Sequence, residues 1–212
     1  MIASFTNGWI FVKTRKTGGT SVEIVLSGWC REPDVCTPVL PDDEIIRARF
    51  GGLAPVTRHN GRPLYNHMPA SEISAAFPRL WQRAFKFTIE RHPYEKAVSR
   101  AYWNLGSRGA DAATEFDREL AQVIETSSFI DRELYIIDGA LAVDEVILHD
   151  RLWERIGAIG REAGKSLPDP LPMAKGHFRL EKRPASEILT AAQKSAIQQA
   201  AAFEFSTFGF LP

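Results

Sequence analysis

One short segment of the chain combines residue types that can bind an anionic group. Residues 13–22 read Lys-Thr-Arg-Lys-Thr-Gly-Gly-Thr-Ser-Val. Gly18 and Gly19 let the backbone turn sharply, so that successive N–H groups and the start of a following helix can surround an anion. Thr20 and Ser21 add hydroxyl donors. The segment predicts a phosphate-binding loop, and the alternative interpretation is an ordinary glycine turn with two solvated lysines.

The order of residues in this loop differs from that of a magnesium–ATP loop. A Walker A motif places its lysine after the glycines, whereas Lys16 precedes Gly18 and Gly19. A P-loop kinase or NTPase is therefore disfavoured. It stays open as an alternative, as does a nucleotide-binding protein without catalytic activity.

A second segment, residues 87–103, contains another candidate anion site. Arg91 stands where a predicted strand passes into a predicted helix, and Ser99 follows two helical turns later. An arginine there can bind a phosphate through two parallel hydrogen bonds, and a serine on the same helix face can add a hydroxyl. The alternative is an arginine in a surface ion pair and a serine tolerated within the helix.

The elements that position these segments alternate between strand and helix. A strand over 9–14 leads through the glycine pair to a helix over 20–26, and a strand over 84–90 leads to a helix that starts near Pro93. Other expected elements are helices over 69–76, 112–126 and 151–163, a strand over 145–149, and a C-terminal helix from a capping box at Thr190 to about residue 205. Residues 30–65 are expected to form surface loops with short elements. This order predicts an α/β protein with a central parallel sheet flanked by helices, in one domain over residues 1–212.

Composition narrows the class of protein. The hydrophobic fraction of 44% and the charged fraction of 25% are those of a globular chain, and the formal net charge is zero. Basic residues exceed acidic ones only in the first half of the chain, too weakly for a nucleic-acid-binding protein. No secretory leader or membrane-spanning run is recognisable, and Cys30 and Cys36 are expected to be free thiols without a zinc site. We expect a cytoplasmic protein with no integral membrane segment and no metal.

Together, in this order, the two segments resemble the PAPS-dependent sulfotransferase superfamily, where PAPS is 3′-phosphoadenosine 5′-phosphosulfate. The resemblance is to the carbohydrate O-sulfotransferase branch, which includes the 2-O-sulfotransferases and their bacterial relatives. It extends to residues 143–152 and 203–210, and so covers nearly the whole chain. It implies a P-loop-like three-layer fold and transfer of a sulfuryl group, without metal, from PAPS to a hydroxyl acceptor, which the branch implies is a saccharide.

The resemblance also implies roles for single residues. The donor's 5′-phosphosulfate is assigned to Lys16, Thr17, Gly18, Gly19, Thr20 and Ser21, with Lys16 as the catalytic lysine, and the 3′-phosphate to Arg91 and Ser99. His67, in a segment comparable to one that carries the family's catalytic histidine, is the expected general base. A neutral imidazole, with a pKa of about 6–7 before burial or the charge of the donor shifts it, suits that role.

Several positions leave alternatives open. Arg15 stands where the family often has proline, His149-Asp150 replaces a common Glu-Asn pair, and Glu204 replaces a common aspartate. His59 is the second candidate for the base, whereas His92 is expected to start its helix and His149 to end a strand. Residues 175–183 either close over the 3′-phosphate or form a solvated charged stretch.

Overall fold

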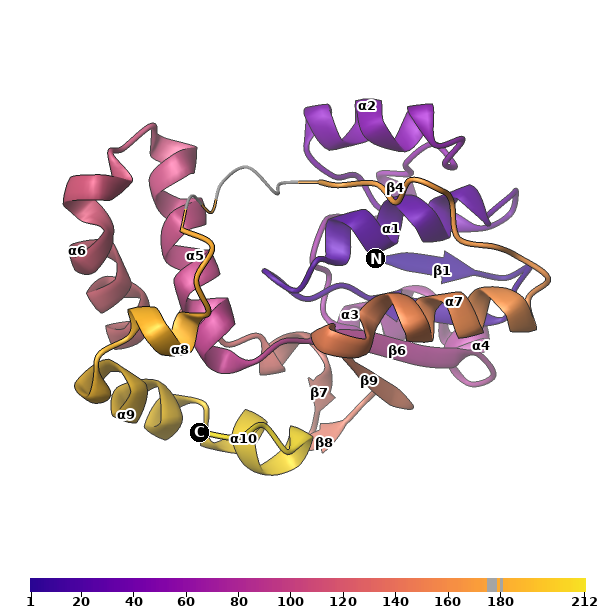
Figure 1. Cartoon of the computed structure of the whole chain (residues 1–212). Coiled ribbons are helices and arrows are strands. Elements are labelled where there is room, and N and C mark those ends of the chain that lie inside the picture. The colour runs from indigo at the N-terminus through magenta and orange to yellow at the C-terminus, as the bar shows by residue number, and fades with distance from the viewer. Residues whose placement is uncertain (175–178, 180) are drawn as a thin grey trace. The chain divides into compact units, whose positions relative to one another are not determined.

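The structure, a computed structural model, describes residues 1–174, 179 and 181–212 (Figure 1). The chain divides into two compact units. The first combines Met1–Glu90 with Arg132–Ala174, and the second combines Arg91–Asp131 with Lys175–Pro212. Because each unit is built from two separate stretches, no single cut in the chain separates them. One domain over residues 1–212 stays a prediction.

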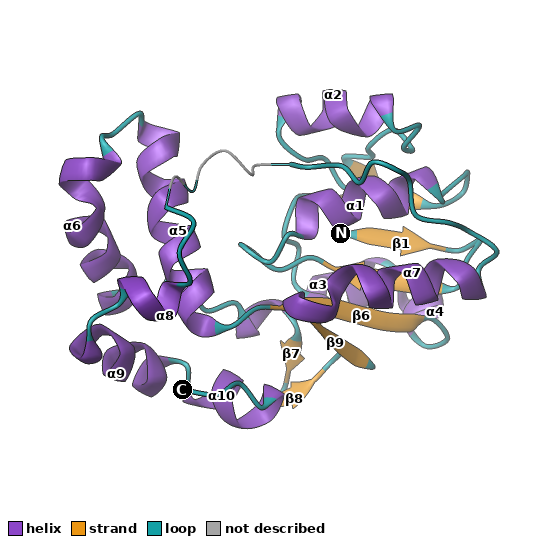
Figure 2. Ribbon diagram, in the orientation of Figure 1, coloured by secondary structure: helices purple, strands orange, loops and turns teal. Residues whose placement is uncertain are grey.

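A five-stranded sheet organises the first unit (Figure 2). Its order is β3 (Val35–Cys36), β1 (Ile2–Ser4), β2 (Trp9–Val12), β6 (Phe85–Glu90) and β9 (Glu145–Leu148). Strands β2, β6 and β9 run parallel, as predicted, whereas β1 is antiparallel to both β2 and β3. The sheet is therefore mixed, and the expected fully parallel sheet is corrected at this edge. The reason is a four-residue turn over residues 5–8, which ends at Gly8 with a φ of 73° and returns the chain antiparallel to itself.

The first unit also contains helices. They are α1 (Gly19–Gly28), α2 (Pro41–Arg49), α3 (Ala70–Ala76), α4 (Pro78–Trp81) and α7 (Leu152–Glu162), with short 3₁₀ turns at Arg132–Leu134 and His149–Arg151. Phe11, Phe87 and Ile147 on one sheet face join a single apolar core with residues of α1 and α7. The alternate strand residues Ile10 and Val12, which point to the opposite face, are also fully buried. The two remaining strand pairs are the hairpins β4 (Arg58–His59) with β5 (Arg62–Pro63) and β7 (Ile136–Ile137) with β8 (Ala140–Leu141).

The second unit is helical in its described part. It contains α5 (Pro93–Arg108), α6 (Ala112–Glu125), α8 (Ala185–Ile188), α9 (Ala191–Ala200) and α10 (Ala202–Phe208), and α5, α6 and α9 share one apolar core. The predicted capping box is confirmed, since the Gln193 N–H donates to the Thr190 hydroxyl and the Thr190 N–H donates to the Gln193 side chain. The single predicted C-terminal helix is divided near Ala201 into α9 and α10. No helix in the described part of the chain is both long enough and apolar enough to cross a membrane.

Candidate functional site

The candidate loop lies at the carboxyl end of the parallel strands. Val12 pairs with Thr88, and Glu90 pairs with Leu148, so β2, β6 and β9 end along the same edge of the sheet. Ligands of α/β proteins commonly bind at this edge, because the loops that follow the strands gather there. The loop between β2 and α1 is therefore placed where sequence analysis expected it.

The loop is held in its shape by buried hydroxyl groups. The Thr14 side chain donates to the backbone carbonyl of Ile89 in β6, and the Thr17 hydroxyl lies 2.9 Å from that of Thr14. Both threonine side chains are buried. The hydroxyl of Thr17 thus serves the internal structure of the loop.

Two residues of the loop adopt the left-handed conformation. Gly18, the N-cap of α1, has a φ of 76°, and Lys16 has a φ of 62°. Glycine adopts this conformation without steric cost, but for lysine it costs roughly 1–2 kcal/mol. A non-glycine residue in this conformation is typical of functional sites, where the surrounding structure holds the strain.

The N-terminus of α1 has the electrostatic character of an anion site. Within the described residues, no side chain caps this helix and no acidic residue lies in its first turn. The first N–H groups and the helix dipole therefore keep their partial positive charge. Thr20 is buried, and the hydroxyl of Ser21 accepts a hydrogen bond of 3.1 Å from the Ala174 N–H.

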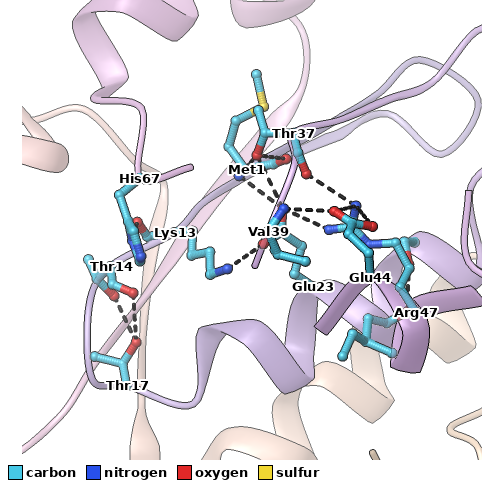
Figure 3. A network of polar contacts seen from close by, with 12 residues as sticks. Met1, Lys13, Thr14, Thr17, Glu23, Thr37, Val39, Glu44, Arg47 and His67 are labelled. Atoms are coloured by element: carbon cyan, nitrogen blue, oxygen red, sulfur yellow. Dashed lines mark hydrogen bonds and ion pairs between the residues drawn. The ribbon is translucent and has the colours of Figure 1, made fainter. Parts of the chain in front are cut away.

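His67 lies beside the loop (Figure 3). Its Nδ1 is 3.1 Å from the carbonyl oxygen of Lys13, the residue that follows β2. Because a carbonyl oxygen only accepts, Nδ1 must carry the proton, and Nε2 is then the nitrogen able to take up another. Burial, together with the charge of Lys13, lowers the pKa of His67 to about 3, so the ring is neutral at pH 7. Burial thus moves the pKa well below the value of about 6–7 that was expected before any effect of burial.

The other described histidines occupy distinct places. His59 packs against Phe77 with ring centroids 4.6 Å apart, and its Nε2 is 3.1 Å from the Asn60 amide of the same hairpin. His92 caps the start of α5 by accepting from the Tyr94 N–H, which confirms the prediction for that residue. His177 is among the residues that the structure does not describe.

His149 is a neighbour of the loop that sequence analysis did not connect with it. It follows β9 directly, as expected of a histidine at a strand end. A Cβ atom built on Gly18 would lie 3.6 Å from its Nε2. The only sequence indication was its place at the end of a parallel strand, because strand ends of one sheet share an edge.

Arg15, whose role was left open, forms an ion pair at the surface of the first unit. Its Nη1 lies 2.8 Å from Glu133 Oε1, and both side chains are partly exposed. Exposed pairs of this kind contribute at most about 1 kcal/mol to stability. The side chain of Arg15 is therefore engaged by the Glu133 carboxylate in this structure.

Arg91 and Ser99 belong to the second unit. Arg91 Nη2 lies 2.8 Å from Glu95 Oε2, Arg179 binds the same oxygen, and the Ala185 N–H donates to Glu95 Oε1 over 2.7 Å. Although burial alone raises it, the pKa of Glu95 lies below its ordinary value because these donors stabilise the carboxylate. Ser99 is half-buried on α5, one turn beyond Glu95. In this structure Arg91 therefore forms an ion pair with Glu95, as the alternative interpretation expected. Its binding of a phosphate stays a prediction.

The predicted role of residues 175–183 falls largely on residues 175–178 and 180, which lie outside the described chain. Cys30 and Cys36 are free thiols, as expected. In the described residues, no group of three or more His, Cys, Asp and Glu side chains is arranged to hold a metal ion. Comparison of the chain with protein-family models, with curated proteins and with solved structures finds no match.

Proposed function

We propose that this protein is a sulfotransferase that moves a sulfuryl group from PAPS to a hydroxyl acceptor. The observation that carries the proposal is the loop from Lys13 to Gly19, in which a lysine in the left-handed conformation precedes the uncapped N-terminus of α1. Such a loop offers backbone donors, a helix dipole and a cation to one anionic group. The resemblance of the loop to that of the sulfotransferase superfamily identifies this anion as the 5′-phosphosulfate.

In the proposed reaction, sulfur transfers in line between two oxygens. The bond from sulfur to the bridging oxygen of the donor breaks as a bond to the acceptor oxygen forms. Negative charge develops on the bridging oxygen of the departing 3′-phosphoadenosine 5′-phosphate, where the ammonium of Lys16 and the loop N–H groups stabilise it. No step of this reaction requires a metal ion.

His67 is the proposed general base. An alcohol is too weak an acid to ionise near neutral pH, so its proton must be taken up as the new bond forms. With Nδ1 donating to Lys13, Nε2 is the atom that takes the proton. The low pKa of the ring keeps it neutral, and the negative charge of a bound donor would raise that pKa and make the ring a stronger base.

The proposal extends to fold and substrate class. The central strands with a phosphate-binding loop after β2 support a P-loop-like three-layer arrangement of the first unit. The resemblance favours a saccharide as acceptor and assigns the 3′-phosphate of the donor to Arg91 and Ser99. A kinase or NTPase is the second candidate, and the position of Lys16 before the glycines speaks against it.

A binding experiment separates these functions. We expect 3′-phosphoadenosine 5′-phosphate to bind the full chain equally well with Mg²⁺ and with EDTA, and ATP to bind much more weakly. Transfer of label from ³⁵S-labelled PAPS to a panel of saccharides would then identify the acceptor class. Magnesium-dependent ATP binding that exceeds binding of the bisphosphate would contradict the proposal and favour the kinase alternative.

A further inference from the structure

A cluster of buried charges lies next to the candidate loop (Figure 3). Its centre is Glu23 of α1, which is fully buried. Its Oε2 lies 2.6 Å from Lys13 Nζ, and its Oε1 lies 3.1 Å from the Met1 amine and 3.5 Å from Arg47 Nη2. Although burial alone raises it, the pKa of Glu23 is lowered to about 2 by these cations, with Lys13 the strongest of them. A carboxylate this deep would cost several kcal/mol without such partners.

Lys13 connects this cluster to the candidate site through three different groups. Its ammonium is held by Glu23, and its backbone carbonyl accepts the hydrogen bond from His67 Nδ1. Its side-chain stem packs against Gly19, since a Cβ atom built on Gly19 would lie only 3.1 Å from Lys13 Cγ. One residue therefore contacts the helix, the histidine and the end of the loop.

The side chain of Lys13 is almost fully buried, with 1% exposed. Its ammonium is thus directed into the protein interior, where Glu23 fixes it. A lysine with this arrangement is suited to holding other groups in place, in contrast to Lys16, which is partly exposed in the loop.

We propose that Lys13 is a positioning residue of the site, anchored on Glu23 so that its carbonyl orients the ring of His67 and its stem supports Gly19. This inference rests on the proposed function only for its effect on turnover. The contacts between Lys13, Glu23 and His67 are independent of which reaction the protein catalyses.

The anchored ammonium also acts on the charge of His67. After burial, Lys13 is the strongest influence lowering the pKa of the ring, and the Met1 amine and Arg15 act in the same direction. The hydrogen bond to the Lys13 carbonyl acts in the opposite direction. Removing the charge of Lys13 should therefore move the pKa of His67 from about 3 towards its ordinary value of 6.5.

NMR of the His67 ring tests the proposal without an assay of activity. The ring signals of His67 are assigned by their absence from the spectrum of His67→Gln. They are then titrated with pH in the wild type and in Lys13→Met/Glu23→Gln. This double variant removes both charges and keeps a side-chain stem at each position. We expect the pKa of His67 to rise in the double variant, and the ring to lose its preference for a proton on Nδ1. Unchanged titration and tautomer would overturn the proposal.

A matched control comes from the second unit. Lys96 and Asp131 form an ion pair of 3.0 Å with side chains only 3% and 1% exposed. Lys96→Met/Asp131→Asn should leave the titration and tautomer of His67 as in the wild type, and a change as large as in the first double variant would contradict the inference. Should Lys13→Met/Glu23→Gln fail to fold, the ¹⁵N shifts of the wild-type ring still decide, since a proton mainly on Nε2 would exclude the contact with Lys13.

Turnover distinguishes this inference from the proposed function. If PAPS is the donor, Lys13→Met/Glu23→Gln should lower kcat with much less effect on binding of 3′-phosphoadenosine 5′-phosphate. If His67 responds in NMR as expected but the wild type transfers no sulfuryl group, the proposed function fails and the positioning role of Lys13 stands.

Discussion

At the scale of single residues, Lys16 differs from an ordinary loop lysine in its left-handed backbone conformation. Lys16 and His67 both have positive φ values, 62° and 57°, which side chains other than glycine rarely adopt. Glycine would meet the same backbone geometry at lower cost. The side chains of these two residues, rather than the conformational needs of the chain, are therefore the features to test.

Replacement of Lys16 by glycine should separate stability from activity. We expect Lys16→Gly to unfold at the wild-type temperature or slightly above, because the left-handed strain of roughly 1–2 kcal/mol is relieved. Turnover should fall about 10²–10³-fold, the usual effect of removing one donor that stabilises a transition state. Calorimetry and a sulfuryl-transfer assay measure the two effects. Wild-type turnover in Lys16→Gly would show that the loop needs only its shape.

His67→Ala should lower the limiting rate by roughly 10²–10⁴-fold and leave donor affinity nearly unchanged. Since the pKa of His67 is about 3, kcat/KM of the wild type should show no His67 limb between pH 5 and 8. An anionic donor bound as proposed would raise that pKa, so the limb of kcat should lie at higher pH than that of kcat/KM. His59→Ala is the matched control, because that ring packs on Phe77 and lies within hydrogen-bond distance of Asn60 in its own hairpin. A loss confined to His59→Ala would transfer the role of base to His59.

At the scale of elements, the sequence predicted those segments whose local pattern is unambiguous. The strand, loop and helix around Gly18, and the helix that starts at Pro93, were found because glycine, proline and apolar periodicity agree there. Helix α2 was missed, although Pro41 opens it, acidic residues fill its first turn and arginines its last. Because much of this helix is exposed, it lacks a clear apolar periodicity, and the prolines around it indicated a loop.

Of the two residues assigned to the 3′-phosphate, Ser99 lies on helix α5 and Arg91 lies two residues before its first residue, Pro93. Arg91→Ala and Ser99→Ala should weaken binding of PAPS and of 3′-phosphoadenosine 5′-phosphate much more than binding of adenosine 5′-phosphosulfate, which lacks the 3′-phosphate. Calorimetric titration of each ligand measures the difference. Arg118→Ala is the control, because Arg118 is 79% exposed and pairs with Glu115 on α6. Equal losses for all three ligands would contradict the assignment.

At the scale of the whole molecule, the least predictable features are contacts between residues distant in sequence. Spacing alone does not indicate that Glu23 is buried between Lys13 and Arg47, or that His67 reaches the Lys13 carbonyl. Such contacts depend on how the sheet and its helices pack. They also change the protonation of the residues involved, which links folding to pH.

The stability of the protein should therefore fall in acid in two successive steps. For His67, the unfolded chain takes up a proton below about 6.5, whereas the folded protein does so only below about 3, so this contribution is lost as the pH falls through that range. Glu23 follows between about 4.5 and about 2, in the same direction. Of these two groups, only His67 acts between pH 6.5 and 4.5.

Urea unfolding at pH 7, 6 and 5 covers this first step, and comparison with a His67 variant separates it from the buried Met1 amine, whose pKa burial also lowers. A single proton bound by only the unfolded state lowers the free energy of unfolding by at most about 1.4 kcal/mol per pH unit. The slope for His67 should stay below this limit near pH 7 and approach it near pH 5, because the imidazole of the unfolded chain becomes fully protonated only below about 6.5. His67→Gln should lose less stability between pH 7 and pH 5 than the wild type. If His67→Gln and the wild type lose stability in parallel, the ring is not held neutral by the fold, and the electrostatic link between His67 and Lys13 is refuted with it.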